Sequence, residues 1–165
     1  MKNLRHRPAT IADASQIAII YAHHVLNGTA TFDFVPPSEV EWRAKIVAIL
    51  AKRWPFIVTE IEGEVAGYAY ATQFRDRPAY VETCENSIYV AYDKLGLGIG
   101  TAMLNSLLGA SKQSGFRQMI AVIGGGEPAS VALHQKCGFE HAGRMHSVGF
   151  KFGKYLDTVY MQRAL

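Results

Sequence analysis

The sequence predicts an α/β (α+β) fold in which helices flank a mixed central sheet. Segments rich in β-branched and aromatic residues alternate with segments of helical apolar spacing. Some predicted strands follow one another through a tight turn, as antiparallel strands do, whereas others are separated by a helix, as parallel strands are. The chain has 165 residues, of which 49% are apolar, so it can bury a core of its own. We therefore expect one domain over residues 1–165.

The first third of the chain predicts one strand and two helices. Leu4–Arg7 has the pattern of a short strand. The capping-box spacing Thr10-x-x-Asp13 predicts a helix that runs to about Asn27, and Ser38-x-x-Glu41 predicts the start of a second helix. Apolar spacing predicts their buried faces, which comprise Ile17, Ile20, Tyr21, His24 and Val25 in the first helix and Trp42, Ile46, Ile49 and Leu50 in the second.

The middle of the chain predicts a hairpin and then a central strand. Phe56–Thr59 and Val65–Tyr70 are strand-like segments on either side of a Glu62-Gly63 turn, which predicts an antiparallel pair. The polar loop Arg75-Asp76-Arg77-Pro78 follows. After it, Ser87-Ile88-Tyr89-Val90 has the β-branched and aromatic composition of a buried strand.

The last third predicts two helices among three strands. A helix ends near Gly115, and its apolar positions are Ile99, Met103, Leu104, Leu107 and Leu108. Arg117–Ile123 has the composition of a buried strand. Pro128 suits the first position of a short helix that runs through Cys137 and stops at Gly138. Two further strands then close the sheet.

Composition and charge argue against several classes of protein. The net charge is +3, and the 17 Lys and Arg residues are scattered rather than clustered, so we expect no nucleic-acid partner. No apolar stretch approaches the thickness of a bilayer, so we expect no membrane partner and a cytoplasmic location. Cys84 and Cys137 lack the spacing of metal ligands, so we expect no metal and two reduced, packed thiols.

A glycine-rich segment follows the predicted central strand and begins a helix. Its sequence is Leu95-Gly96-Leu97-Gly98-Ile99-Gly100-Thr101. The first turn of a helix has N–H groups without intrahelical partners, and glycines let an anion approach them closely. The G-x-G-x-G spacing matches neither a nucleotide P-loop nor a dinucleotide fingerprint. The segment predicts a site for another phosphate chain; the alternative is a connection that binds no ligand.

The order of elements, with Leu133–Phe139 at a helix end, resembles the GNAT acyl-CoA N-acetyltransferases. Within that family, strings along nearly the whole chain are similar to those of phosphinothricin and methionine sulfoximine N-acetyltransferases: Thr29–Asp33, Phe74–Tyr80, Glu85–Val90, Gly115–Gly124 and Gly149–Gly153. The resemblance implies the GNAT fold, acetyl-CoA as donor, a small α-amino acid analogue as acceptor, and a homodimer.

Acetyl transfer to an amine requires a base and benefits from an acid. Glu85 precedes the central strand, where partial desolvation would raise the pKa of its carboxyl group, and the resemblance places the family's base there. Glu82 is the next nearest carboxylate. His134 stands where many family members have a tyrosine that protonates the leaving thiolate; the alternative is a packed helix histidine. Cys84 would allow an acyl-enzyme, but no base is paired with it in the sequence.

The resemblance also implies how the cofactor is held. The central strand splays from its neighbour, and the amide-rich arm of the cofactor pairs with the backbone of Ile88, Tyr89 and Val90. The pyrophosphate lies on Leu95, Gly96, Leu97, Gly98, Ile99, Gly100 and Thr101. Family members often carry Gln or Arg at the position of Leu95, and Asn at the position of Glu127, where it contacts the cofactor. A carboxylate at Glu127 cannot donate a hydrogen bond, and Lys94 is the nearest replacement for the partner missing at Leu95.

The predicted acceptor site centres on a pair of arginines. Arg75 and Arg77 flank Asp76 in the loop before the central strand, and a guanidinium fork matches a carboxylate or phosphinate. We expect substrate binding by Arg75, Asp76, Arg77, Glu85, Asn86 and Ser87, with Phe32, Tyr80, Lys151 and Phe152 around the same pocket.

Two other functions fit the same fold. A different amine, such as a polyamine, an aminoglycoside or a protein N-terminus, would be the acceptor if the arginines had another purpose. Cationic acceptors are disfavoured because arginines would repel them. The departures at Leu95 and Glu127 would instead suit a non-catalytic CoA-binding regulatory protein.

Overall fold

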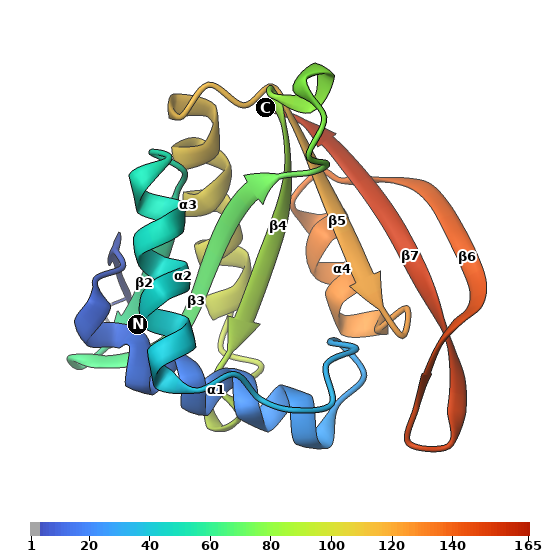
Figure 1. Cartoon of the computed structure of the whole chain (residues 1–165), viewed down its shortest axis with the longest axis horizontal. Coiled ribbons are helices and arrows are strands. Elements are labelled where there is room, and N and C mark those ends of the chain that lie inside the picture. The colour runs from blue at the N-terminus through green and yellow to red at the C-terminus, as the bar shows by residue number, and fades with distance from the viewer. Residues whose placement is uncertain (1–3) are drawn as a thin grey trace.

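The computed structural model, which describes residues 4–165, forms one seven-stranded sheet with helices on both faces (Figure 1). The strand order is β1-β2-β3-β4-β5-β7-β6. Neighbouring strands are antiparallel except for the parallel pair β4 and β5. The strands are β1 (Leu4–Pro8), β2 (Phe56–Ile61), β3 (Glu64–Gln73), β4 (Thr83–Val90), β5 (Gln118–Gly124), β6 (Glu140–Lys151) and β7 (Lys154–Ala164). The predicted mixed sheet in an α/β fold is confirmed.

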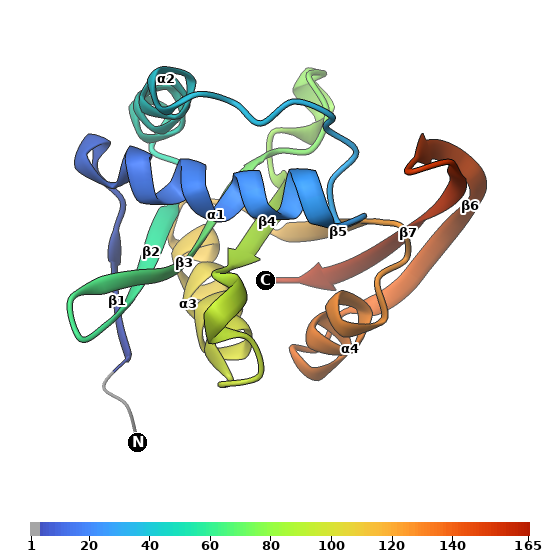
Figure 2. The ribbon, with the colours of Figure 1, turned by 90° about the horizontal axis from the view of Figure 1, so that it is seen from below.

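Two helices cover each face of the sheet. Helices α1 (Ala14–Asn27) and α2 (Glu39–Ala51) pack on one face, where their apolar side chains surround Tyr68 and Tyr70 of β3. Helices α3 (Ile99–Gln113) and α4 (Pro128–Lys136) lie on the other face (Figure 2). There, α3 packs over Cys84 of β4 and Met119 of β5.

The predicted helix starts are present, with two differences of detail. Ser38 N–H donates to a Glu41 oxygen at 2.7 Å, and Glu41 N–H donates to Ser38 Oγ at 3.3 Å, so the second capping box forms. After Thr10, the first turn is a 3₁₀ turn and the α-helix begins at Ala14. The predicted burial of Leu50 is wrong: its side chain is 38% exposed, because the buried stripe of α2 is Trp42, Ile46 and Ile49.

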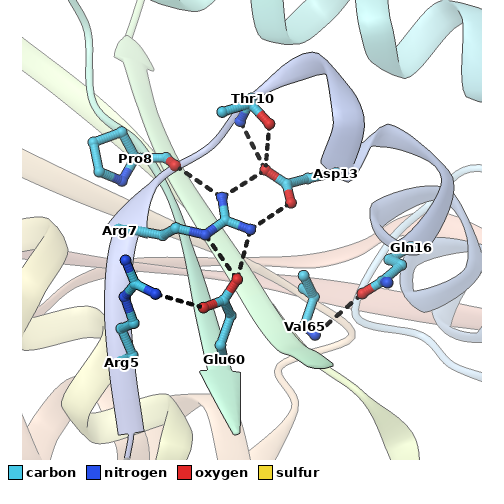
Figure 3. A network of polar contacts seen from close by, with 8 residues as sticks. All are labelled: Arg5, Arg7, Pro8, Thr10, Asp13, Gln16, Glu60 and Val65. Atoms are coloured by element: carbon cyan, nitrogen blue, oxygen red, sulfur yellow. Dashed lines mark hydrogen bonds and ion pairs between the residues drawn. The ribbon is translucent and has the colours of Figure 1, made fainter. Parts of the chain in front are cut away.

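An ion-pair network fixes the first strand to the first helix (Figure 3). The Arg7 guanidinium donates to both carboxylate oxygens of Asp13, at 2.8 and 2.7 Å, and its Nε donates to Glu60 of β2 at 2.7 Å. Burial by itself raises the pKa of Asp13, but the hydrogen bonds from Arg7 and Thr10 outweigh it, so the pKa lies below its usual range. The network therefore stabilises the ionised carboxyl group.

The interior extends on both sides of the sheet. Predicted core positions of α3 are buried, as are the thiols of Cys84 and Cys137, neither of which is in a disulfide. Among the described residues, no helix has the length and apolarity needed to cross a bilayer.

Candidate active site

The sheet opens at its centre, where β4 and β5 part. The parallel ladder joins Thr83–Asn86 to Gln118–Ala121 and ends there, although β4 continues to Val90 and β5 to Gly124. The other edge of β4 stays paired with β3 as far as Val90. The two strands diverge from this point in Figure 1, with α4 beside the gap. One edge of β4, over its last four residues, is thus left without a neighbouring strand.

Alternation along β4 decides which backbone groups face this opening. Ala91 N–H donates to Ala66 O of β3, so the backbone of Tyr89, two residues earlier, also faces β3. The N–H and C=O groups of Ile88 and Val90 therefore face the opening. The Val90 carbonyl accepts a hydrogen bond from His24 Nε2 of α1 at 2.9 Å. Tyr89 differs from Ile88 and Val90, the other two residues of β4 predicted to bind the cofactor: its backbone faces β3, and its ring packs on Tyr21 at 4.9 Å between centroids.

Two hollows adjoin each other at the opening. The inner cavity, of about 250 Å³, lies where the strands part and is lined by Glu85, His134 and residues 30–32 among others. The long cleft, of about 570 Å³, runs from there past Val90 to the glycine segment and the outer face of α4. Ala30, Ile88, Tyr89 and Ser130 line both. The inner cavity and the long cleft are therefore neighbours, with β4 and α4 along both.

The glycine segment forms the far end of the long cleft. Gly96 and Gly98 have φ values of 76° and 77°, a left-handed conformation that costs a glycine little. The first helical bond of α3 runs from Ala102 N–H to Gly98 O, so the preceding N–H groups, from Ile99 to Thr101, have no intrahelical partner. Leu95 lines the cleft, whereas the exposed Leu97 does not. The predicted loop-to-helix cradle is present.

Gly100 has a different reason to lack a side chain. A Cβ atom there would lie 3.3 Å from Leu133 Cδ2 of α4. The glycine thus permits the close contact between α3 and α4 that forms one side of the cleft.

Charged groups mark the edges of the long cleft. Lys94 and Lys136 line it, and Lys94 Nζ also contacts Asp93 at 2.7 Å. Glu127 lines it too, and its carboxylate accepts a hydrogen bond from Thr29 Oγ1 at 2.6 Å. Glu127 therefore holds the segment after α1.

Glu85 lies on the α1/α2 side of the sheet. Side chains alternate along β4, so Glu85 shares a face with Tyr89 and is opposite to Cys84. Its half-buried carboxylate lines the inner cavity and has no hydrogen-bond partner among residues 4–165. Burial raises the pKa of Glu85, and the nearby charge of Arg75 opposes this only in part. Glu82, by contrast, is exposed and near Arg117.

The arginine loop lies outside the inner cavity, next to Glu85. Gln73 Nε2 donates to the carbonyl oxygens of Arg75 and Arg77, at 2.7 and 3.1 Å, and so shapes the loop. The Arg75 guanidinium lies 4.7 Å from the centroid of the Phe74 ring. Asp76 and Arg77 are exposed, and neither side chain makes an ion pair within the described chain.

His134 approaches the inner cavity from the opposite face. The ring is 2% exposed; its Nδ1 lies 2.8 Å from Ser130 O, and its Nε2 lies 3.2 Å from the Asn86 side-chain amide. A carbonyl oxygen only accepts, so Nδ1 carries a proton. Burial lowers the pKa of His134, although the bond to Ser130 opposes this. In the neutral ring Nε2 accepts, and the otherwise unpartnered Asn86 Nδ2 supplies a donor when the amide is turned by 180°.

The Asn86 side chain points to a different face of the sheet from those of Glu85 and Ser87. Its side chain lies on the α3/α4 side with His134, whereas Glu85 and Ser87 point to the α1/α2 side. All three nevertheless line the inner cavity, so they stay together at one site.

Cys84 does not suit a nucleophile. Its side chain is fully buried under α3, and burial raises the pKa of the thiol to about 12. At neutral pH the thiolate is therefore scarce, and the acyl-enzyme alternative loses its support.

Sequence reasoning also misplaced or missed residues around the cavity. Phe32 lines it as predicted, but Phe152 is exposed and Tyr80 packs edge-on to Phe74. Lys151 is buried and contacts the segment after α1. His24 was assigned only to the helix core, because no local pattern reveals that its ring reaches β4.

Comparisons with known proteins agree with this geometry. Residues 7–160 match the family described as "Acetyltransferase (GNAT) domain". A phosphinothricin N-acetyltransferase from Alcaligenes faecalis is 47% identical over 154 residues, which cover 93% of this chain and 78% of that protein. An L-methionine sulfoximine/L-methionine sulfone acetyltransferase from Pseudomonas aeruginosa is 36% identical over 157 residues, 94% of this chain and 91% of that protein.

A comparison with solved structures also finds a closely similar fold. A GNAT superfamily phosphinothricin acetyltransferase from Sinorhizobium meliloti, crystallised with acetyl-CoA, superposes with a TM-score of 0.96 at 48% identity, covering 98% of this chain and 88% of that one. The splayed strands, the glycine cradle and these matches confirm the resemblance drawn from the sequence: the chain belongs to the GNAT family of acetyltransferases.

Proposed function

We propose that this protein transfers the acetyl group of acetyl-CoA to the α-amino group of a small amino acid analogue, of the phosphinothricin or methionine sulfoximine type. The observation that carries the proposal is the opening between β4 and β5, which joins a half-buried carboxylate to a phosphate-binding cradle. Three relatives named for these two acceptors are 36–47% identical to it over nearly the whole chain.

The residues of the long cleft fit acetyl-CoA. The free N–H groups at the start of α3 would hold the pyrophosphate, with Lys94 and Lys136 as nearby positive charges. The N–H and C=O groups of Ile88 and the N–H group of Val90 would pair with the amide-rich arm, whereas the Val90 carbonyl already accepts from His24. Glu127 donates no hydrogen bond to the cofactor in this proposal, because a carboxylate only accepts and one of its oxygens already accepts from Thr29. Leu95 contributes only apolar contact.

Glu85 would act as the general base. Because its pKa is raised towards neutrality, its carboxylate is a better proton acceptor than an ordinary exposed glutamate. The acceptor nitrogen attacks the thioester carbonyl, the C–S bond breaks, and the amine proton moves to Glu85 directly or through a water. A backbone N–H of Ile88 or Val90 would stabilise the oxyanion. The chemistry needs no enzyme nucleophile and no metal, and within residues 4–165 no cluster of metal-ligating side chains is present.

We propose His134 as the proton donor to the thiolate, and its hydrogen bonds set a condition on that role. Its Nδ1 proton is committed to Ser130, so Nε2 has a proton to give only in the imidazolium form. Burial lowers the pKa of His134, so that form is scarce at neutral and alkaline pH. A thiol with a pKa of about 8.5 is already a fair leaving group near pH 8. We therefore expect His134 to contribute less than Glu85.

The acceptor's acidic group would lie by the arginine loop. Arg75 is close enough to Glu85 to influence its charge, so an α-amino group at Glu85 places the neighbouring carboxylate within reach of Arg75. Asp76 and Arg77 would shape the rim of this site. A polyamine or aminoglycoside is less suitable, because it brings positive charge to the same arginine.

The test is release of CoA thiol from acetyl-CoA in the presence of each candidate acceptor. A non-catalytic CoA-binding protein would bind acetyl-CoA but release no thiol. The cytoplasmic location and the homodimer remain predictions, the first from composition and the second from the resemblance.

A further inference from the structure

One short segment of the chain lines both hollows of the site. Residues 28–33 follow the end of α1, and five of them, residues 28–32, line one or both of the hollows beside β4. Thr29 and Ala30 line the long cleft, and Ala30, Thr31 and Phe32 line the inner cavity. A shift of this segment, which we call the wall loop, would therefore alter both hollows together.

Lys151 is the main anchor of the wall loop. It ends β6, and its side chain is 2% exposed. The ammonium group donates to Gly28 O and Thr31 O, both at 2.9 Å. Burial lowers the pKa of Lys151, while Asp33 opposes the change. A buried ammonium that spans two carbonyl groups fixes both the start and the middle of the loop.

The β6–β7 hairpin also positions Phe32, the aromatic residue of the wall loop. Phe32 lies over Gly149, and a Cβ atom at Gly149 would be only 2.4 Å from Phe32 Cε2. Only a glycine leaves room for the ring in this position. The hairpin thus holds the wall loop by a polar contact at Lys151 and by packing at Gly149.

Two further contacts limit how the wall loop can move. Tyr21 OH lies 2.6 Å from both Thr31 Oγ1 and an Asp33 carboxylate oxygen. Thr29 Oγ1 bonds Glu127 at the start of α4. The loop is therefore held from α1, from α4 and from the β6–β7 hairpin, three parts of the chain that are distant in sequence.

We propose that Lys151 is a positioning residue that sets the binding of both substrates through the wall loop. The proposal rests on the proposed function, because it assigns acetyl-CoA to the long cleft and the acceptor to the inner cavity. Without the ammonium group, a buried carbonyl group at Thr31 and a partly buried one at Gly28 lose their partner and regain one only by turning towards water. That movement displaces Ala30, which lines both hollows.

The test compares Lys151→Met with Lys154→Met. Methionine keeps the length of the side chain and removes the donor, while Lys154 is an exposed lysine of the same hairpin whose side chain makes no polar contact within residues 4–165. We expect Lys151→Met to raise the acetyl-CoA Kd and the KM of both substrates about tenfold, with kcat at saturation changed less than about threefold. Lys154→Met should match the wild type.

A merely structural role gives a different pattern. Loss of folded protein lowers kcat per mole of chain and leaves KM and Kd unchanged, and that result would overturn the proposal. If Lys151→Met does not fold, Gly149→Ala tests the same loop by displacing Phe32; unchanged KM and Kd in that folded variant would equally overturn it. Binding of acetyl-CoA needs no acceptor, so the Kd measurement stands even if no acceptor is acetylated and the proposed function fails.

Discussion

Replacing Glu85 by Gln removes the group on which the proposed chemistry depends most. Glutamine keeps the shape of the side chain but cannot take a proton. A positioned general base contributes about 10²–10⁴-fold, which is about 2.7–5.4 kcal/mol of barrier at 1.36 kcal/mol per tenfold. Because the half-buried carboxylate has a raised pKa and no competing hydrogen bond in the described chain, we expect a loss of at least about 10²-fold in kcat near pH 7.

The pH dependence gives the same prediction a second readout. The base must be ionised, so wild-type kcat/KM falls as pH falls through the raised pKa of Glu85. In Glu85→Gln that acid limb disappears, and the loss of rate shrinks at high pH, where the free amine form of the acceptor predominates. Rates come from initial velocities of thiol release across pH. Glu82→Gln is the matched control, since it removes an exposed carboxylate three residues away and should leave kcat unchanged. If folded Glu85→Gln kept kcat within about threefold and retained the acid limb, the base assignment would be wrong.

The remaining predictions concern the acceptor, the cofactor, the acid and the fold. Arg75→Ala should raise the acceptor KM about tenfold without changing the acetyl-CoA Kd. An unchanged KM would show that Arg75 does not bind the acceptor's carboxylate. Gly98→Ala meets no steric obstacle but strains a positive φ by about 1–2 kcal/mol, so calorimetry should show weaker acetyl-CoA binding at unchanged acceptor KM. His134→Gln should cost less than about tenfold at pH 8, and a loss equal to that of Glu85→Gln would show that an acid is essential there. Arg7→Met should lower the free energy of unfolding by about 1–3 kcal/mol, since Arg7 is a quarter exposed. The pKa of Asp13 is lowered by folding, so the stability that Arg7→Met removes is present at neutral pH and is lost as pH falls below about 4. The urea denaturation midpoints of wild type and variant should therefore converge there.

Local patterns explain why so much of the fold was predictable. The Ser38 capping box, the Glu62-Gly63 turn and the proline at the start of α4 act through neighbours in sequence, so their residue types identify them. The glycine cradle was predictable for the same reason, because free N–H groups follow from the start of any helix.

Long-range contacts were beyond local reasoning. Lys151 has the residue type of a pocket cation, and only the path of the β6–β7 hairpin shows that its partners are carbonyl groups 120 and 123 residues earlier. Asn86 was grouped with Glu85 by proximity in sequence, although alternation in a strand sends adjacent side chains to opposite faces. The gap between β4 and β5 came from the family resemblance, since no residue pattern marks where a ladder stops.

The central claim is the transfer of acetyl to an amino acid analogue, and thiol release from acetyl-CoA tests it most directly. The purified protein is supplied with methionine sulfoximine, phosphinothricin, ordinary amino acids, a polyamine and an aminoglycoside in turn. We predict rapid turnover with methionine sulfoximine, phosphinothricin or both, and little with the cationic amines. If no acceptor gave thiol release while acetyl-CoA still raised the melting temperature, the result would contradict catalysis and favour a CoA-binding protein. Turnover confined to the polyamine or the aminoglycoside would contradict the proposed acceptor class.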